Sequence, residues 1–354
     1  MPGYDPFLRG RFPVGVRTLR LHDEARGRVF TAEVWYPARA HYERQDLEHA
    51  TQDAFSALPS GTIRRQMAVR DAATEPGRYP LIAYSHHSGG NRRSATFLCT
   101  HLSSHGYFVA ALDHSEISAA ERQPAPAETA VERAKRIEAM IASRVPDLRY
   151  LLDAVARDDV LDPGVSLETA GIGLVGHSFG GWTALATAEQ DPRIAAVVAL
   201  APAGSSKTKP GILQLHLSFA RSRSVPTMYL VARDDVTLPL PGMIELFERT
   251  PGSKTMVVLS NADHLHFVDD IADDHEAVRN MPFTGELTWI PKEMRPITEL
   301  CLPGHAHDFV RGLALSHFDA VLLPRQEARR FLANELARAL ARRHIEAYSY
   351  EPSK

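Results

Sequence analysis

Hydrophobic residues along the chain fall into short apolar runs that alternate with longer amphipathic stretches. The opening third contains three strand-like runs separated by polar breaks, at residues 14–21, 29–36 and 80–84. From residue 80 onward, apolar runs typical of buried strands alternate with stretches whose apolar residues recur at helical spacing. This alternation predicts an α/β protein in which a mostly parallel central sheet carries helices on both faces.

The elements after residue 84 can be placed by their apolar runs and by the residues that end helices. Gly106 suits the left-handed conformation that closes a helix, so we expect a helix over residues 94–105 and a strand over 107–112. Further strands are expected over residues 171–175, 194–200, 225–231 and 254–259, and helices over 146–155 and 179–189. An apolar stripe from Phe331 to Leu340 predicts a last helix that docks on the sheet.

Two segments interrupt this pattern. Residues 37–78 are polar and only weakly helical at 45–48, and we expect them to cover one edge of the fold. Residues 265–322 are too long for a simple connection, and their Phe267, Phe283 and Trp289 predict a cap over an apolar binding site. We expect residues 1–354 to form a single domain that contains both insertions.

Composition and charge narrow the classes of function. The chain is 44% hydrophobic and 23% charged, which is ordinary for a globular protein. Its 40 basic and 43 acidic residues leave a net charge of −3, so we expect no nucleic-acid partner. No run approaches the about 18 apolar residues of a membrane span, and the first residues lack the apolar core of a secretion signal.

Cysteine usage bears on the cellular compartment. Cys99 and Cys301 are the only cysteines, too few for a disulfide framework, although one bridge between them stays open. A reducing compartment fits this usage. We therefore expect a cytoplasmic protein, with a signal peptide removed from the sequence as the alternative.

The strongest chemical signal is the segment Gly-His-Ser-Phe-Gly-Gly at residues 176–181. It follows the apolar strand 172–175 directly and precedes a helix, which is the context of a nucleophile elbow. The turn is so tight that side chains at the flanking positions clash, which explains Gly176 and Gly180. Ser178 is therefore the expected nucleophile, and a glycine-rich turn that binds phosphate or only packs closely is the alternative.

A serine hydroxyl needs a base and an acid that orients the base, and after such an elbow the acid precedes the histidine along the chain. The strand ending near residue 231 runs into Asp234 and Asp235; we expect Asp235 to be the acid and keep Asp234 as the alternative. The following strand runs into His264, the expected base, with His266 two residues away as its competitor.

An acyl-transfer site also needs N–H donors for the oxyanion. The N–H of Phe179 is one expected donor, because Phe179 follows the nucleophile. The other is expected from residues 85–90, where Gly89 and Gly90 let the backbone turn; we assign Ser88, with His87 as the alternative.

Seventeen histidines raise the question of a metal site. The pairs His86 and His87, His264 and His266, and His305 and His307 show no recognised zinc spacing with a companion acid. We expect neither a metal nor another cofactor.

These motifs resemble the α/β-hydrolases related to platelet-activating-factor acetylhydrolase and the predicted dienelactone hydrolases of bacteria. The likeness runs over most of the chain, and its specific part is the elbow at residues 176–181; residues 14–19, 33–38 and the Ser85-His86 loop support it. The resemblance implies the α/β-hydrolase fold and hydrolysis of carboxylic esters without a metal, often with short or modified acyl groups.

The chain departs from these relatives at three places. His87 occupies the position where the oxyanion loop usually has glycine, and we expect it to border the substrate together with Phe267. Dienelactone hydrolases proper use a cysteine nucleophile, whereas Ser178 stands here. In the acetylhydrolase the acid follows the strand after the nucleophile helix, but here that strand ends in Leu200-Ala201-Pro202, which favours Asp235.

The sequence therefore predicts a serine hydrolase that cleaves small-molecule carboxylic esters of short to medium acyl length through an acyl-enzyme. Amide hydrolysis or acyl transfer by the same residues is one alternative. A binding module without catalysis on the same scaffold is another. The sequence makes no prediction of the oligomeric state.

Overall fold

The computed structural model describes residues 3–56, 61–118, 128–157, 160, 162–219 and 224–351. They group into two compact units, taken here one at a time. The N-terminal unit is Arg9–Ile172, and the C-terminal unit combines Met1–Leu8 with Gly173–Lys354. Strand β8 (Val165–His177) begins in the first unit and ends in the second. The single domain expected from the sequence stays a prediction.

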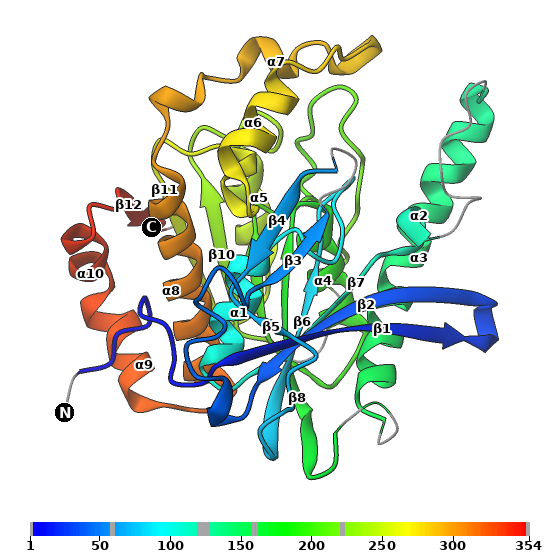
Figure 1. Cartoon of the computed structure of the whole chain (residues 1–354). Coiled ribbons are helices and arrows are strands. Elements are labelled where there is room, and N and C mark those ends of the chain that lie inside the picture. The colour runs from blue at the N-terminus through cyan, green and yellow to red at the C-terminus, as the bar shows by residue number, and fades with distance from the viewer. Residues whose placement is uncertain are drawn as a thin grey trace. The chain divides into compact units, whose positions relative to one another are not determined.

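A sheet with the strand order β8-β6-β7-β2-β1-β5 forms the centre of the N-terminal unit. Its strands, with the separate β3–β4 pair, are β1 (Val14–Asp23), β2 (Arg28–Pro37), β3 (Asp53–Ser56), β4 (Ile63–Gln66), β5 (Val69–Arg70), β6 (Gly77–Ser85) and β7 (Phe108–Leu112). β6 and β7 run parallel, whereas β2 is antiparallel to both β7 and β1. Figure 1 shows β1 and β2, in blue, as a long antiparallel pair.

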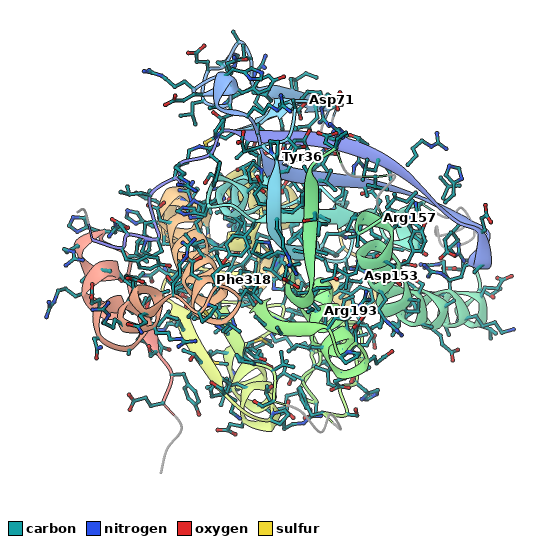
Figure 2. All side chains as sticks on the ribbon, turned by 90° about the horizontal axis from the view of Figure 1, so that it is seen from below. Tyr36, Asp71, Asp153, Arg157, Arg193 and Phe318 are labelled. Carbon is teal, nitrogen blue, oxygen red and sulfur yellow. The ribbon has the colours of Figure 1, made fainter. Side chains whose placement is uncertain are left out.

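The described part of the N-terminal unit also contains the α-helices α1 (Thr96–Ser104), α2 (Ser115–Ser118) and α3 (Ala130–Val155) and the short 3-10 helices η1 (Glu24–Arg26) and η2 (Ala40–Tyr42). α1 packs against β2 and β7, and α3 packs against β6 and β7. Tyr36 of β2, labelled in Figure 2, is buried, and its hydroxyl donates a hydrogen bond to the carbonyl of Ala72. Of the strands that these helices cover, β7 is wholly apolar and buried, as expected for a strand in the interior of the unit.

The C-terminal unit has the strand order β12-β11-β10-β9-β8. Its elements are α4 (Phe179–Gln190), β9 (Ile194–Leu200), β10 (Thr227–Ala232), α5 (Leu240–Arg249), β11 (Lys254–Leu259), η4 (His264–Phe267), α6 (Ile271–Arg279), η5 (Gly285–Leu287), α7 (Ile290–Glu293), η6 (Ile297–Glu299), α8 (Pro303–Val321), α9 (Gln326–Arg330), η7 (Phe331–Glu335), α10 (Leu336–Arg342) and β12 (Ala347–Ser349). β9, β10 and β11 are parallel, and β12 is an antiparallel edge. All six residues of β10 are buried, as expected for a strand covered on both faces.

The mostly parallel sheet with packed helices confirms the fold class predicted from the alternating pattern. Each expected strand occurs: β9 and β11 have the expected ends, β8 begins six residues earlier than expected, and the other ends shift by three residues or fewer. The helix expected over 146–155 is longer, because a capping box between Thr129 and Glu132 starts α3 at Ala130 and the helix continues through Pro146. Residues 45–48 form turns rather than the weak helix expected.

The two predicted insertions contain regular elements. Residues 37–78 include the β3–β4 pair; within that range residues 57–60 lie outside the described part of the chain. Residues 265–322 include η4, α6, η5, α7 and η6, but also α8, which packs against β9 and β10. Phe318 of α8, labelled in Figure 2, is fully buried, so this helix belongs to the core. The part of the range that remains for a cap is residues 268–302.

No helix among the described residues is both long and apolar enough to cross a membrane. The last helices contact the sheet at its edge: α10 contacts the edge strand β12, whereas α9 contacts α8 and Phe331 packs edge-on against the rings of Tyr4 and Phe7. Both cysteines are free, so the possible bridge between Cys99 and Cys301 is absent.

Candidate active site

The turn between β8 and α4 holds Ser178 in a strained backbone conformation. Ser178 has φ 57° and ψ −116°, in a region that residues with a Cβ seldom adopt. Its N–H donates to the carbonyl of Leu200 at 2.9 Å, and its own carbonyl accepts from the N–H groups of Trp182 and Ala203 at 3.1 and 2.9 Å. These three bonds fix the serine between the end of β8 and the start of α4.

Close backbone approach explains the glycine at the start of this turn. A Cβ added to Gly176 would lie 2.1 Å from the carbonyl oxygen of Gly180, nearer than real Cβ atoms approach. A Cβ on Gly181 would lie 2.7 Å from the Cβ of Pro202. The tight elbow expected from the sequence is therefore present, and it is closed by contacts that only glycine permits.

Parallel pairing brings the expected acid and base to one edge of the sheet. Ala232 at the end of β10 pairs with Leu259 at the end of β11, so Asp235 and His264 follow neighbouring strand ends. The side chain of Asp235 is 1% exposed, and its Oδ1 accepts a hydrogen bond from the N–H of Leu238 at 2.8 Å. This bond orients the other carboxylate oxygen toward His264.

His264 links the serine to the aspartate. Its Nδ1 lies 2.7 Å from Oδ2 of Asp235, and its Nε2 lies 2.9 Å from Oγ of Ser178. Because a carboxylate only accepts, Nδ1 carries the proton, and Nε2 accepts from the serine hydroxyl. Burial alone would lower the pKa of His264, but the carboxylates of Asp235 and Asp263 together raise it above its ordinary value. The raised pKa favours protonation of the imidazole of His264.

The alternatives left open by the sequence have other partners. Oδ2 of Asp234 faces the guanidinium of Arg295 at 3.5 Å, and its N–H donates to Ala262. His266 is fully buried, and its Nδ1 lies 2.9 Å from Oδ1 of Asp263. The structure therefore brings Asp235 and His264, rather than Asp234 and His266, together with Ser178.

Asp263 is a residue near the site that sequence reasoning missed. It starts η4 by accepting a hydrogen bond from the N–H of Leu265, and it lies 2.7 Å from Nε2 of His275. Burial would raise the pKa of Asp263, but His266 and His275 hold it well below its ordinary range. Asp263 therefore stays ionised and fixes the turn that carries His264. An aspartate just before a histidine-containing turn was the available signal.

His177 is a second residue that the sequence did not mark as functional. Its ring centroid lies 4.8 Å from that of His264 and 5.5 Å from that of Phe267. Phe267 was expected to border the substrate, yet it is fully buried behind His177. The described contacts give it a packing role, and its expected substrate contact stays a prediction.

The expected oxyanion donors lie in different units. Phe179 is the first residue of α4, next to Ser178 in the C-terminal unit. Ser88 and His87 lie in the N-terminal unit, on the loop between β6 and α1, where Ser88 is exposed and His87 half-buried. Their expected roles stay predictions. Among the described residues, no group of three His, Cys, Asp or Glu side chains is arranged to hold a metal ion.

Comparison with known proteins gives relatives in both sequence and structure. The family described as "Platelet-activating factor acetylhydrolase, isoform II" matches residues 16–143. The platelet-activating factor acetylhydrolase of Cavia porcellus is 30% identical over 215 residues, which cover 52% of this chain and 49% of that protein. The one of Gallus gallus is 26% identical over 172 residues, which cover 38% and 41%. The chain thus spans about half the length of these curated relatives.

A solved structure matches nearly the whole chain. The ferulic acid esterase from Streptomyces cinnamoneus covers 89% of this chain and 92% of its own, with a TM-score of 0.60 and 24% identity. Identity this low supports the fold alone. The sequence and structure matches together confirm the resemblance that the motifs carry: the chain is an α/β-hydrolase-fold protein related in sequence to the platelet-activating factor acetylhydrolases.

Proposed function

We propose that the chain is a serine esterase that hydrolyses carboxylic esters through an acyl-enzyme. The observation that carries the proposal is the hydrogen-bonded row of Ser178, His264 and Asp235, with contacts of 2.9 and 2.7 Å. A nucleophile, a base and an acid that orients the base are the parts that acyl transfer requires. The sequence relationship to acetylhydrolases supports the same chemistry.

The first half of the reaction forms the acyl-enzyme. Oγ of Ser178 attacks the ester carbonyl while Nε2 of His264 takes its proton, and Asp235 stabilises the imidazolium that results. The N–H of Phe179 and, as expected from the sequence, that of Ser88 stabilise the oxyanion. The imidazolium then protonates the leaving alkoxide, and the alcohol departs.

The second half releases the acid. Nε2 of His264 takes a proton from water, whose oxygen attacks the acyl carbon. Collapse of the second tetrahedral intermediate expels Oγ of Ser178, which regains its proton from His264. The serine is thereby restored, and no cofactor takes part in any step of the proposal.

Apolar side chains beside the acid and the base support an apolar acyl group in the substrate. Leu265 follows His264 and packs with Ile290 and Met294, whereas Val236 follows Asp235 and packs on the same group. The other partly buried members are Ile212, Val278, Phe283, Leu287 and Trp289. We therefore propose esters of short to medium acyl length as substrates.

Hydrolysis of a p-nitrophenyl ester series from acetyl to decanoyl tests this proposal. Ser178→Ala is expected to lower kcat on the order of 10⁴-fold or more, and a fluorophosphonate is expected to label the parent but not the variant. Turnover that survives in Ser178→Ala refutes the assignment. Platelet-activating factor and a feruloyl ester belong in the series, because the relatives' names are platelet-activating factor acetylhydrolase and ferulic acid esterase.

Two further measurements distinguish the alternatives. Product analysis with an added alcohol or amine separates hydrolysis from acyl transfer, and a matched anilide tests for amide cleavage. A parent that neither turns over any ester nor reacts with the fluorophosphonate is a binding module rather than an enzyme.

A further inference from the structure

Asp263, the residue before His264, has a partner at each of its carboxylate oxygens. Oδ1 accepts a hydrogen bond from the N–H of Leu265 at 3.0 Å and lies 2.9 Å from Nδ1 of His266. Oδ2 lies 2.7 Å from Nε2 of His275, a buried residue of α6. The carboxylate therefore joins the turn η4 to the helix that packs against it, and all of these residues belong to the C-terminal unit.

Starting the turn η4 does not require a charge at position 263. One side-chain oxygen is enough to accept from the first N–H groups of a helical turn, and asparagine or serine does this as well as aspartate. The side chain of Asp263 is only 5% exposed, and a buried carboxylate costs free energy unless a cation or hydrogen bonds compensate it. The charge of Asp263 therefore calls for an explanation beyond the cap.

The surroundings of His275 favour its charged form. Its Nε2 faces Asp263, and its Nδ1 lies 3.5 Å from Oε1 of Glu276, which is itself paired with Arg279 at 3.7 Å. Burial would lower the pKa of His275, but Asp263 and Glu276 raise it above its ordinary value. Carboxylates at both nitrogens favour the ring with two N–H groups, so His275 compensates the charge of Asp263.

Two further titratable groups on elements near this turn stay uncharged at neutral pH. From α8, which also packs on η4, His307 places its Nε2 2.9 Å from the carbonyl oxygen of Val268, and burial lowers its pKa. Burial raises the pKa of the Cys301 thiol to about 12, and the charge of Asp263 acts in the same direction. Neither group therefore compensates Asp263 or adds to its charge.

Two carboxylates act on the imidazole of His264. Asp235 contacts Nδ1 directly, and Asp263 acts from the neighbouring position along the chain. The ring of His177, with its centroid 4.8 Å from that of His264, is the other titratable group in contact with the base among the described residues. In the proposed mechanism the imidazolium forms during the reaction, so a second negative charge nearby lowers the barrier.

We propose that Asp263 and His275 form a positioning pair for His264: the carboxylate anchors the turn and places a second negative charge beside the base, and His275 holds the carboxylate in place. This inference rests on the proposed esterase function. Asp263 and His275 act through the turn and through their charges rather than by touching the substrate, so they are positioning residues and not catalytic ones.

Asparagine at position 263 separates the charge from the cap, because it keeps an oxygen for the N–H of Leu265. We expect kcat of Asp263→Asn on a p-nitrophenyl ester to fall by about three- to tenfold with KM within about twofold, because the imidazolium of His264 is absent from the ground state. The rise of kcat/KM with pH is expected to move to lower pH. Asp273→Asn is the matched control: it removes an exposed carboxylate from α6 and is expected to change neither kcat nor the pH profile.

Two substitutions at position 275 test the other member of the pair. In His275→Gln an NH₂ group can still face Oδ2 of Asp263, whereas His275→Leu leaves that buried oxygen without a donor. We expect kcat to fall by about tenfold in His275→Leu and to stay within about threefold of the parent in His275→Gln. A role in packing alone would lower the melting temperature of both variants without separating their kcat values.

The titration of His264 itself gives a readout that needs no turnover. It is followed by NMR on isotopically labelled histidine, with the signal assigned by its loss in His264→Gln. In Asp263→Asn this titration is expected to move to lower pH.

Three outcomes overturn the inference: a titration of His264 in Asp263→Asn that matches the parent, kcat of His275→Leu within threefold of the parent, or an equal shift in Asp273→Asn. If one variant does not fold, the variant at the other position of the pair decides. A parent without ester turnover or fluorophosphonate labelling refutes the proposed function instead, and the titration still tests whether Asp263 acts on His264.

Discussion

Replacing Asp235 by asparagine isolates the effect of its charge, because the two side chains have nearly the same shape. In the parent, Oδ1 accepts from the N–H of Leu238 and Oδ2 accepts from Nδ1 of His264. An asparagine has only one oxygen for these two donors. If that oxygen stays with Leu238, the NH₂ group faces His264 and donates to Nδ1. The ring proton then moves to Nε2, where it blocks proton transfer from Ser178.

The expected size of the effect follows from two contributions. The carboxylate and the imidazolium it stabilises are opposite charges with centres about 4 Å apart, which attract by about 4 kcal/mol at an effective dielectric constant of about 20. That corresponds to about a thousandfold in rate. For Nδ1 of His264 to carry the proton again, the asparagine must turn its oxygen toward His264. Its NH₂ then faces the N–H of Leu238, and these two opposed donors cost about 1–3 kcal/mol, which is roughly another tenfold in rate. We therefore expect kcat to fall on the order of 10⁴-fold in Asp235→Asn.

The assay is ester hydrolysis from pH 5 to 10, with Asp234→Asn as the matched control. The proposed mechanism requires neutral His264, so kcat/KM of the parent is expected to rise with pH. Burial lowers the pKa of His264, but Asp235 and Asp263 raise it above its ordinary value, so the rise is expected to be centred above that value. In Asp235→Asn the remaining rise is expected to shift to lower pH. Asp234 forms only a partly exposed ion pair with Arg295, so Asp234→Asn is expected to keep kcat. A variant at position 235 with more than a tenth of the parent kcat refutes this reasoning.

Two further predictions concern stability. Burial lowers the pKa of His317 to about 4. Between about pH 6.5 and 4 this histidine is therefore protonated in the unfolded chain but neutral in the folded one. The free energy of unfolding is expected to fall as pH falls through that window. In His317→Gln, urea unfolding is expected to show a pH slope smaller by up to about 1.4 kcal/mol per unit, and an unchanged slope contradicts the assignment. Gly176→Ala places a Cβ 2.1 Å from the carbonyl oxygen of Gly180 and is expected to destabilise the fold by about 1–3 kcal/mol or more. Gly304→Ala, with nothing within 4 Å of its Cβ, is the thermal-denaturation control, and equal melting temperatures for the two variants would exclude the steric argument.

Local patterns predicted the central strands and the row of three side chains at their ends. The apolar runs at β9, β10 and β11 are buried on both faces, so hydrophobicity alone places them. Once these strands are parallel, residues just after them gather at one edge, and Ser178, Asp235 and His264 all follow strand ends. Order along the chain narrowed the acid to Asp234 or Asp235 and the base to His264 or His266, because topology converts that order into proximity. The choice within each pair needed the side-chain contacts.

Side chains whose partners are distant in sequence were beyond such reasoning. Arg144 contacts Glu116 and the carbonyls of His86 and His87, at separations of 28 to 58 residues, and no local pattern marks it. The start of α3 was missed for a different reason, since Pro146 was read as a helix start although the capping box at Thr129 lies in the sequence. The short edge strand β12 has too few apolar residues to stand out.

The strained backbone of Ser178 lowers the stability of the folded state at the residue on which the proposed activity depends. A non-glycine residue at φ 57° and ψ −116° costs the folded state on the order of 1–3 kcal/mol, and glycine avoids most of that cost. Under the proposed function, position 178 is therefore one where glycine, the residue that favours folding most, would be inert. Packing in the surrounding core has to offset the free-energy cost of serine relative to glycine at position 178. Random mutagenesis with selection for thermal stability alone is therefore expected to favour replacement of Ser178, with loss of turnover.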